Sequence, residues 1–188
     1  MMRCIAIAIA LLVASSAFAQ APEKNPAASY FANISLVDQD GRRVDLYNDL
    51  MKGKTVAINS FFTSCSGSCP VMARAFLHAQ EALGNRLGDD VILVSITVDP
   101  TNDTPAALKG YAQRMKAKRG WYFLTGTSDE VDAALRKIGQ YTATREEHVN
   151  VIVVGNDRTG LWKKLMALAK PNEILTSIMS VADDHPAE

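Results

Sequence analysis

Hydrophobic and polar positions along this chain follow two alternating spacings. Runs rich in β-branched and aromatic residues, at 55–62 and 91–98, are typical of strands buried inside a sheet. Between these runs, from Pro70 onward, apolar residues recur three or four positions apart from Met72 to Leu87, which is the spacing of one helix face. The pattern therefore predicts a strand, a helix and a second strand in succession.

The same alternation continues on both sides of this unit. The other predicted elements, in chain order, are a hairpin at 34–46 with its turn at Asp40-Gly41, a helix opening at Thr104-Pro105, a strand at 121–124, a helix with a capping box at Thr127 and Glu130, strands at 149–154 and 161–166, and a last helix opening at Pro171. This order is typical of α/β proteins. It predicts a thioredoxin-like sandwich, a central mixed sheet flanked by helices, with an added N-terminal β-hairpin.

The first segment is predicted to be a targeting signal and not part of the fold. Arg3 precedes an apolar run that is too short to span a bilayer, and Ala17-Phe18-Ala19 has the small-x-small pattern of a signal peptidase site. We therefore predict a cleaved signal peptide at 1–19, a linker at 20–29, one domain at 30–182 and a polar tail at 183–188. The protein would be periplasmic or otherwise exported. The alternative is anchoring by an uncleaved N-terminal segment.

Composition limits the function to a local site. The chain has 188 residues, of which 48% are hydrophobic, and 20 Lys and Arg balance 20 Asp and Glu. A chain of zero net charge has no basic field that would attract nucleic acid, so we expect no nucleic-acid partner.

One cysteine pair carries the candidate chemistry. Removal of the signal peptide discards Cys4 and leaves Cys65-Ser-Gly-Ser-Cys69 ahead of Pro70, between the strand at 55–62 and the following helix. A thiol at a helix start has a lowered pKa, and Gly67 is expected to let the loop turn tightly. In an oxidising compartment such a pair can form a disulfide, act as a redox pair or bind a metal.

A metal site would need a third ligand, for which the chain offers three histidines. His78 is predicted to lie on the surface of a helix, and His185 lies in the tail. His148 stands just before the strand expected beside the central one, near the position where thioredoxin-like folds usually hold a cis-proline that this chain lacks. Two thiolates and an imidazole suit Cu(I) and can hold Cu(II), but zinc accepts the same ligands.

The motifs resemble those of the SCO/SenC family of copper-binding, thioredoxin-like proteins. The resemblance runs from about Ile34 to Val181 and is carried by the cysteine block at 62–70, the Asp-Pro segment at 94–105, Leu124-Thr-Gly126 and His148. It implies that Cys65, Cys69 and His148 are the copper ligands. It also implies that Asp99 supports ligand geometry or thiol reactivity, although Asp99 alone could be a loop-capping carboxylate.

Three functions follow from this resemblance and from the thiol pair. The first is a copper metallochaperone that delivers copper to the CuA centre of cytochrome c oxidase subunit II or a similar acceptor. The second is a thiol-disulfide oxidoreductase in which Cys65 and Cys69 are the redox pair. The third is a copper or redox sensor that acts through a partner. Apart from these features, the methionines at 72, 115, 166 and 179 are predicted to pack in the core.

Overall fold

The protein is built on one mixed β-sheet. The computed structural model describes residues 26–147 and 151–185. The strands of its sheet are β1 (Ser35–Asp38), β2 (Arg43–Asp45), β3 (Thr55–Phe61), β4 (Val91–Thr97), β5 (Trp121–Thr125), β6 (Val151–Asn156) and β7 (Leu161–Met166). Their spatial order is β2-β1-β5-β4-β3-β6-β7.

Strand direction changes at two places in the sheet. The three central strands β3, β4 and β5 run parallel, as expected for strands joined by helical crossovers. On one side β6 is antiparallel to β3, and on the other β1 is antiparallel to β5. The start of β6 therefore lies beside the end of β3, where Ile152 is opposite Asn59.

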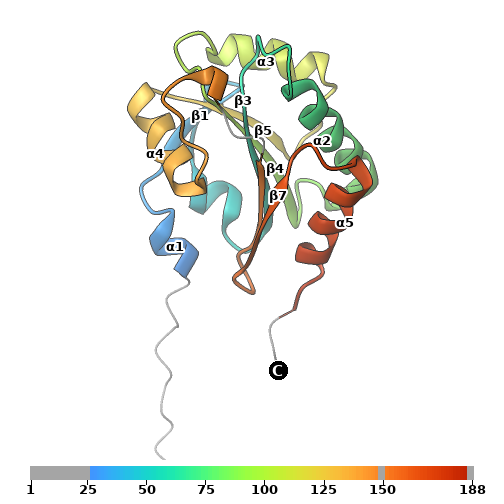
Figure 1. Cartoon of the computed structure of the whole chain (residues 1–188). Coiled ribbons are helices and arrows are strands. Elements are labelled where there is room, and N and C mark those ends of the chain that lie inside the picture. The colour runs from blue at the N-terminus through green and yellow to red at the C-terminus, as the bar shows by residue number, and fades with distance from the viewer. Residues whose placement is uncertain (1–25, 148–150, 186–188) are drawn as a thin grey trace, which may run out of the picture.

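Helices cover both faces of the sheet (Figure 1). One face carries α2 (Cys69–Leu83), α3 (Pro105–Arg114) and α5 (Pro171–Ala182). The other face carries α1 (Pro26–Tyr30), the single-turn π-helix η1 (Leu46–Met51) and α4 (Ser128–Ile138). Two short 3₁₀ turns, η2 (Gly84–Arg86) and η3 (Arg145–Glu147), complete the described elements.

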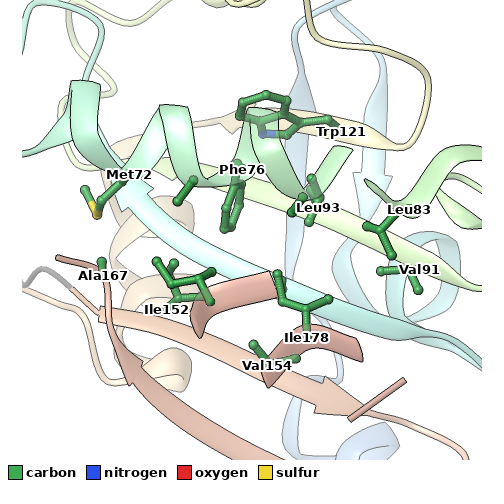
Figure 2. Packing of buried hydrophobic residues seen from close by; sticks show 14 of the residues in the cluster. Met72, Phe76, Leu83, Val91, Leu93, Trp121, Ile152, Val154, Ala167 and Ile178 are labelled. Atoms are coloured by element: carbon green, nitrogen blue, oxygen red, sulfur yellow. The ribbon is translucent and has the colours of Figure 1, made fainter. Parts of the chain in front are cut away.

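Alternation along the strands divides the core between these two layers. In β3, Ala57 and Phe61 belong to the cluster under α2, whereas Val56 and Ile58 belong to the cluster under α4. Figure 2 shows the first cluster, in which Phe76 of α2 lies over the sheet near Leu93 and Trp121. Because every β3 residue is buried, this strand is a rigid base for the loop that follows it.

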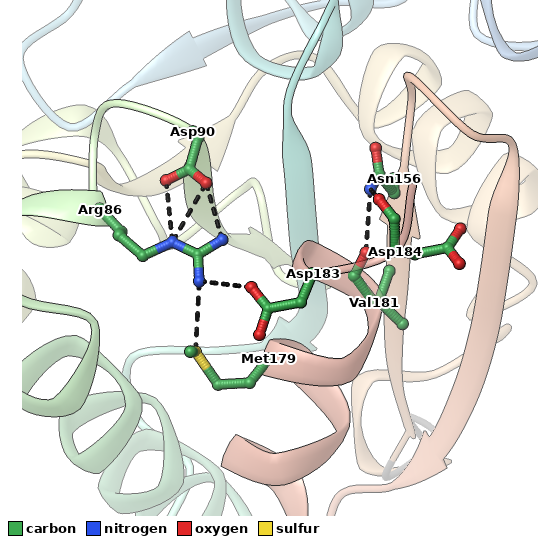
Figure 3. Close-up of polar contacts among 7 residues, drawn as sticks. All are labelled: Arg86, Asp90, Asn156, Met179, Val181, Asp183 and Asp184. Atoms are coloured by element: carbon green, nitrogen blue, oxygen red, sulfur yellow. Dashed lines mark hydrogen bonds and ion pairs between the residues drawn. The ribbon is translucent and has the colours of Figure 1, made fainter. Parts of the chain in front are cut away.

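The end of α5 is fixed by polar contacts (Figure 3). The Arg86 guanidinium donates to the Asp90 carboxylate at 2.8 Å and to the Asp183 carboxylate at 2.7 Å. The Asn156 side chain donates to the Val181 carbonyl at 2.9 Å, which satisfies one of the orphan carbonyls at the helix end. These contacts join η2, α5 and β6, and they reach Asp183, the first residue of the predicted tail.

The fold class predicted from the sequence is confirmed, and the strands lie where the apolar runs place them. Three short elements among the described residues were not predicted: α1, η1 and η3. A five-residue helix, α1, overlaps the segment expected to be a linker, and η1 follows the hairpin. The prediction for Met166 was wrong, because its side chain is 66% exposed, whereas Met72 is fully buried. Met166 points to the same face of β7 as Lys164, which is also exposed.

Within the described residues, no helix has the length and apolar character needed to cross a membrane. The predicted signal peptide at 1–19 lies outside the described residues.

Candidate metal centre

The cysteine pair lies at the connection between β3 and α2. Cys69 is the first residue of α2 and is 2% exposed, while Cys65 is half-buried in the preceding loop. The Cys65 N–H donates to the Phe62 carbonyl at 3.2 Å, which folds the loop back on the end of β3. The two thiols are within hydrogen-bonding reach of each other, so the structure brings the predicted pair together.

Burial controls the chemistry of the inner thiol. Burial, and after it the hydrogen bond with Cys65, raises the pKa of Cys69 to about 12. The lowered value expected from the helix start is wrong for the metal-free protein, because removal of the sulfur from water outweighs the backbone N–H groups. Cys69 is therefore a thiol at neutral pH and releases its proton when it binds a metal.

The loop does not depend on a special glycine conformation. Gly67 is not among the glycines with positive φ, and a Cβ built on it meets nothing within 4 Å. The expectation that Gly67 permits a tight turn is therefore wrong. Three intervening residues supply enough backbone for both sulfurs to meet without it.

A buried carboxylate holds the start of the loop. Asp103 is 1% exposed, and its carboxylate accepts from the Thr63 N–H at 3.1 Å and from the Thr63 hydroxyl. The Thr97 hydroxyl at the end of β4 donates to the same carboxylate at 2.5 Å. Because a buried charge must be satisfied by donors, Asp103 ties the residue two positions before Cys65 to the neighbouring strand.

Asp99 lies at the end of β4, beside the cysteine loop. Its carboxylate accepts from the Asn102 side chain at 2.9 Å and from Arg145 at 2.6 Å. Burial alone would raise the pKa of Asp99, but these two donors outweigh burial and hold the pKa below its usual value. Asp99 therefore caps its own loop and also pairs with a cation from a distant segment.

Arg145 connects this network to the cysteine loop. Its guanidinium lies 5.6 Å from the centre of the Phe62 ring and pairs with Asp99. Sequence reasoning missed both Arg145 and Asp103. Asp103 stands in the Asp-Pro segment and could have been singled out there, but nothing in the sequence sets Arg145 apart from the other surface arginines.

The aromatic side chain of Tyr111 belongs to the same buried cluster as the cysteine pair. Burial raises the pKa of the Tyr111 hydroxyl to about 12, and the charges of Cys69 and Cys65 act in the same direction. The Tyr111 ring packs 5.2 Å from Phe61 and 5.7 Å from Phe123, measured between ring centres. The wall beside the cysteine pair is therefore apolar and aromatic.

The third predicted ligand, His148, lies outside the described residues. The segments on either side of it converge on the same end of the sheet: Arg145 contacts Asp99 at the end of β4, and Ile152 is opposite Asn59 near the end of β3. Within residues 26–147 and 151–185, no group of three or more His, Cys, Asp and Glu residues could hold a metal ion. The ligand set that includes His148 stays a prediction.

The other two histidines are His78 and His185. His78 is half-buried on α2, and its buried Nε2 has no hydrogen-bond partner among the described residues, so its predicted surface position is only partly correct. His185 is exposed after α5.

Comparisons with known proteins agree on one family. The family model SCO1/SenC matches residues 22–183. The SCO1 protein homolog of Bacillus subtilis is 36% identical over 92 residues, which are 48% of this chain and 46% of that protein. The matched part thus spans about half the length of this curated relative.

Solved structures share the fold over most of the chain. The structure of Arabidopsis thaliana ScoI with copper bound has a TM-score of 0.66 and 25% identity, and the alignment covers 78% of this chain and 94% of that one. A structure of BsSco, described as having a disulfide switch and as a member of the Sco family of cytochrome c oxidase assembly proteins, has a TM-score of 0.65 and 26% identity over 79% of this chain and 90% of that one.

Proposed function

The chain belongs to the SCO1/SenC family, and on this premise we propose that it is an exported copper carrier that serves cytochrome c oxidase assembly. The proposed ligands are the two thiolates of Cys65 and Cys69 and the imidazole of His148. The proposed acceptor is the CuA centre of subunit II or a similar copper-binding protein. The observation that carries the proposal is the meeting of the two thiols at the start of α2.

The chemistry of the donor set supports copper as the cargo. Thiolates are soft ligands that suit Cu(I) as well as zinc, and a similar solved structure with copper bound favours copper. The apolar wall formed with Tyr111 and Phe61 lowers the local polarity and limits access of water to the metal. A three-coordinate site of this kind can release its ion stepwise, because a partner's thiolate can enter before both of its own ligands have left.

The unequal burial of the two sulfurs gives transfer a direction. Cys65 is half-buried and Cys69 is buried, so an acceptor can approach the ion on the Cys65 side. Asp103 holds the start of the loop through Thr63 during the exchange, and Asp99 holds Arg145, whose guanidinium lies over Phe62.

An anaerobic Cu(I) titration of the reduced protein tests the proposal. We expect one equivalent of copper, with strong binding lost in Cys65→Ser, Cys69→Ser and His148→Ala. The matched controls are His78→Ala and His185→Ala, which remove an imidazole elsewhere and should leave the titration unchanged. Binding that persists in the triple ligand variant would contradict the proposal.

The arrangement of the sulfurs also favours a second function, thiol-disulfide exchange. The half-buried Cys65 can attack a partner disulfide as a thiolate and form a mixed disulfide, with one partner thiolate leaving. Cys69 then attacks Cys65, which releases the second partner thiol and leaves a Cys65–Cys69 disulfide. The partner is reduced by two electrons and this protein is oxidised by two.

Trapping separates the two functions. If exchange is the main role, Cys69→Ser should accumulate a mixed disulfide with a partner whose two copper-binding cysteines are oxidised, and His148→Ala should react as fast as the unmodified protein. If copper carriage is the main role, His148→Ala should abolish transfer of copper to the reduced partner. The absence of any trapped species would exclude the exchange function.

A further inference from the structure

A second site lies on the face of the sheet opposite α2. It is a cavity of about 510 Å³ between α1, the end of α4 and the strands β6 and β7, and we call it the α1–α4 cavity. This volume is typical of sites that enclose small molecules. Neither cysteine lines it, and its apolar residues belong to the core cluster under α4.

The inner wall of the α1–α4 cavity is aromatic. The rings of Phe31 and Trp162 lie 5.5 Å apart, and Phe31 is 4% exposed. Trp162 is held against the backbone of Gly155 on the neighbouring strand, since a Cβ at Gly155 would lie 2.2 Å from its ring. The indole is therefore fixed in place, and Ile138 and Val153 complete an apolar slot.

The outer part of the α1–α4 cavity is basic. Arg136, Lys137 and Lys164 line it, no acidic residue does, and none of the three forms an ion pair within the part of the chain that the structure describes. Lys163 also lines the cavity but turns its ammonium to Ser180 on the other face, at 3.1 Å. Three positive charges thus surround an aromatic slot.

Aromatic rings hold two of these cations in place. The Lys137 ammonium lies 4.5 Å from the centre of the Tyr30 ring, and the Arg136 guanidinium lies 3.4 Å from the centre of the Tyr141 ring. The Tyr30 hydroxyl donates to the Lys137 carbonyl at 2.8 Å, which ties α1 to the end of α4. Cation–π contact positions a positive charge without neutralising it, so both cations stay available to an anion.

We propose that the α1–α4 cavity binds a small planar molecule that carries an anionic group. The planar body stacks in the slot beside Trp162 and Phe31, and the anion meets Lys137, Lys164 and Arg136. Aromatic carboxylates and sulfonates have this chemistry. Charge complementarity selects such a ligand over a neutral one, and the fixed indole selects a flat body over a branched one.

The test uses 2-naphthoate as the probe and its neutral analogue 2-naphthamide, with binding followed by ¹H–¹⁵N NMR on the purified protein. We expect 2-naphthoate to shift the signals of the Trp162 indole, Gly139 and Lys137, and 2-naphthamide to bind about tenfold more weakly. The double variant Lys137→Gln/Lys164→Gln should also lose about tenfold in affinity. The charge-matched control, Lys52→Gln/Lys170→Gln, should bind as the unmodified protein does.

Two further measurements keep the result clear. Trp162→Leu should weaken both probes, because it removes the stacking surface and leaves the cations. Cys65→Ser/Cys69→Ser should bind 2-naphthoate normally, so that failure of the copper proposal and failure of this one are distinguishable. The inference is overturned if 2-naphthoate gives no shifts, if it shifts signals all over the surface, or if both lysine double variants bind equally well.

Discussion

The guanidinium of Arg145 lies 2.6 Å from the carboxylate of Asp99, across 46 residues of sequence. This ion pair joins the end of β4 to η3, the last described element before the segment that contains His148. Arg145 also covers the Phe62 ring beside the cysteine loop. The pair therefore holds both chain segments that carry the proposed copper ligands.

Loss of Arg145 should weaken copper binding as well as folding. Arg145→Gln removes the cation from Asp99 and frees η3, so we expect the affinity for Cu(I) to fall about fivefold in a competitive titration. The loss of stability should be at most about 1 kcal/mol, because the arginine is 40% exposed. Arg86→Gln is the control: it breaks contacts at the end of α5 and should lower stability without changing copper affinity.

The pair of Asp99 and Arg145 makes the stability of the protein depend on pH. The pKa of Asp99 is lowered in the folded protein, so the contribution of its carboxylate to stability is present above the unfolded value of about 4 and is lost as the pH falls through the folded value. The free energy of unfolding in urea should be higher for the unmodified protein than for Arg145→Gln at pH 7, and this difference should be smaller at pH 3. An equal difference at both pH values would contradict this assignment.

Asp103 should matter for the cysteine loop as well as for stability. Asp103→Asn places an amide where the Thr63 and Thr97 hydroxyls donate, so one buried donor loses its acceptor. We expect a loss of about 1–3 kcal/mol in urea unfolding and faster alkylation of Cys65 in the folded protein. Asp89→Asn changes an exposed carboxylate and should alter neither measurement. Unchanged alkylation in Asp103→Asn would show that Asp103 stabilises the fold without positioning the loop.

Cys69 should be almost inert in the reduced, metal-free protein. Its pKa of about 12 leaves about one molecule in ten thousand as thiolate at pH 8. Iodoacetamide followed by peptide mass spectrometry should therefore find Cys65 modified first, with modification of Cys69 rising steadily between pH 8 and pH 11. The raised value also stabilises the folded state below about pH 8.5, and this contribution is lost as the pH rises toward 12. Alkylation of Cys69 at the rate of a free cysteine at pH 8 would contradict this expectation.

Sequence reasoning succeeded where one residue pattern determines one structure. Fully buried strands such as β3 and β4 leave uninterrupted apolar runs, and a proline or a capping box marks the starts of α2, α3, α4 and α5. It failed where tertiary contacts decide. The five residues of α1 fold because Ala27 and the following Phe31 pack under α4, and the local sequence does not encode that contact.

The candidate site shows the same division. Cys65 and Cys69 are close in sequence, so their meeting could be predicted. The pKa of Cys69 could not be predicted, because it depends on how deeply the fold buries this sulfur. Arg145 reaches Asp99 only through the fold, and a single arginine in a polar segment carries no signal of such a role.

Gly155 should be indispensable to the wall of the α1–α4 cavity. A Cβ at this position would lie 2.2 Å from the Trp162 ring, so Gly155→Ala must displace either the indole or the strand. We expect a loss of about 1–3 kcal/mol in urea unfolding and a shift in tryptophan emission as the ring becomes more exposed. Gly67→Ala is the matched control, because its new methyl group meets nothing within 4 Å and should change stability by less than about 0.5 kcal/mol.

A double-mutant cycle separates the clash from other effects of Gly155→Ala. Trp162→Leu removes the ring that the new methyl group would strike, so the double variant should be more stable than the sum of the two single losses predicts. The expected coupling is about 1 kcal/mol or more, because the two residues are direct cross-strand partners. Strictly additive losses would mean that Gly155→Ala destabilises the protein through the backbone of residue 155 and not through a clash with Trp162. Gly155 would then not be what fixes the indole in the aromatic slot.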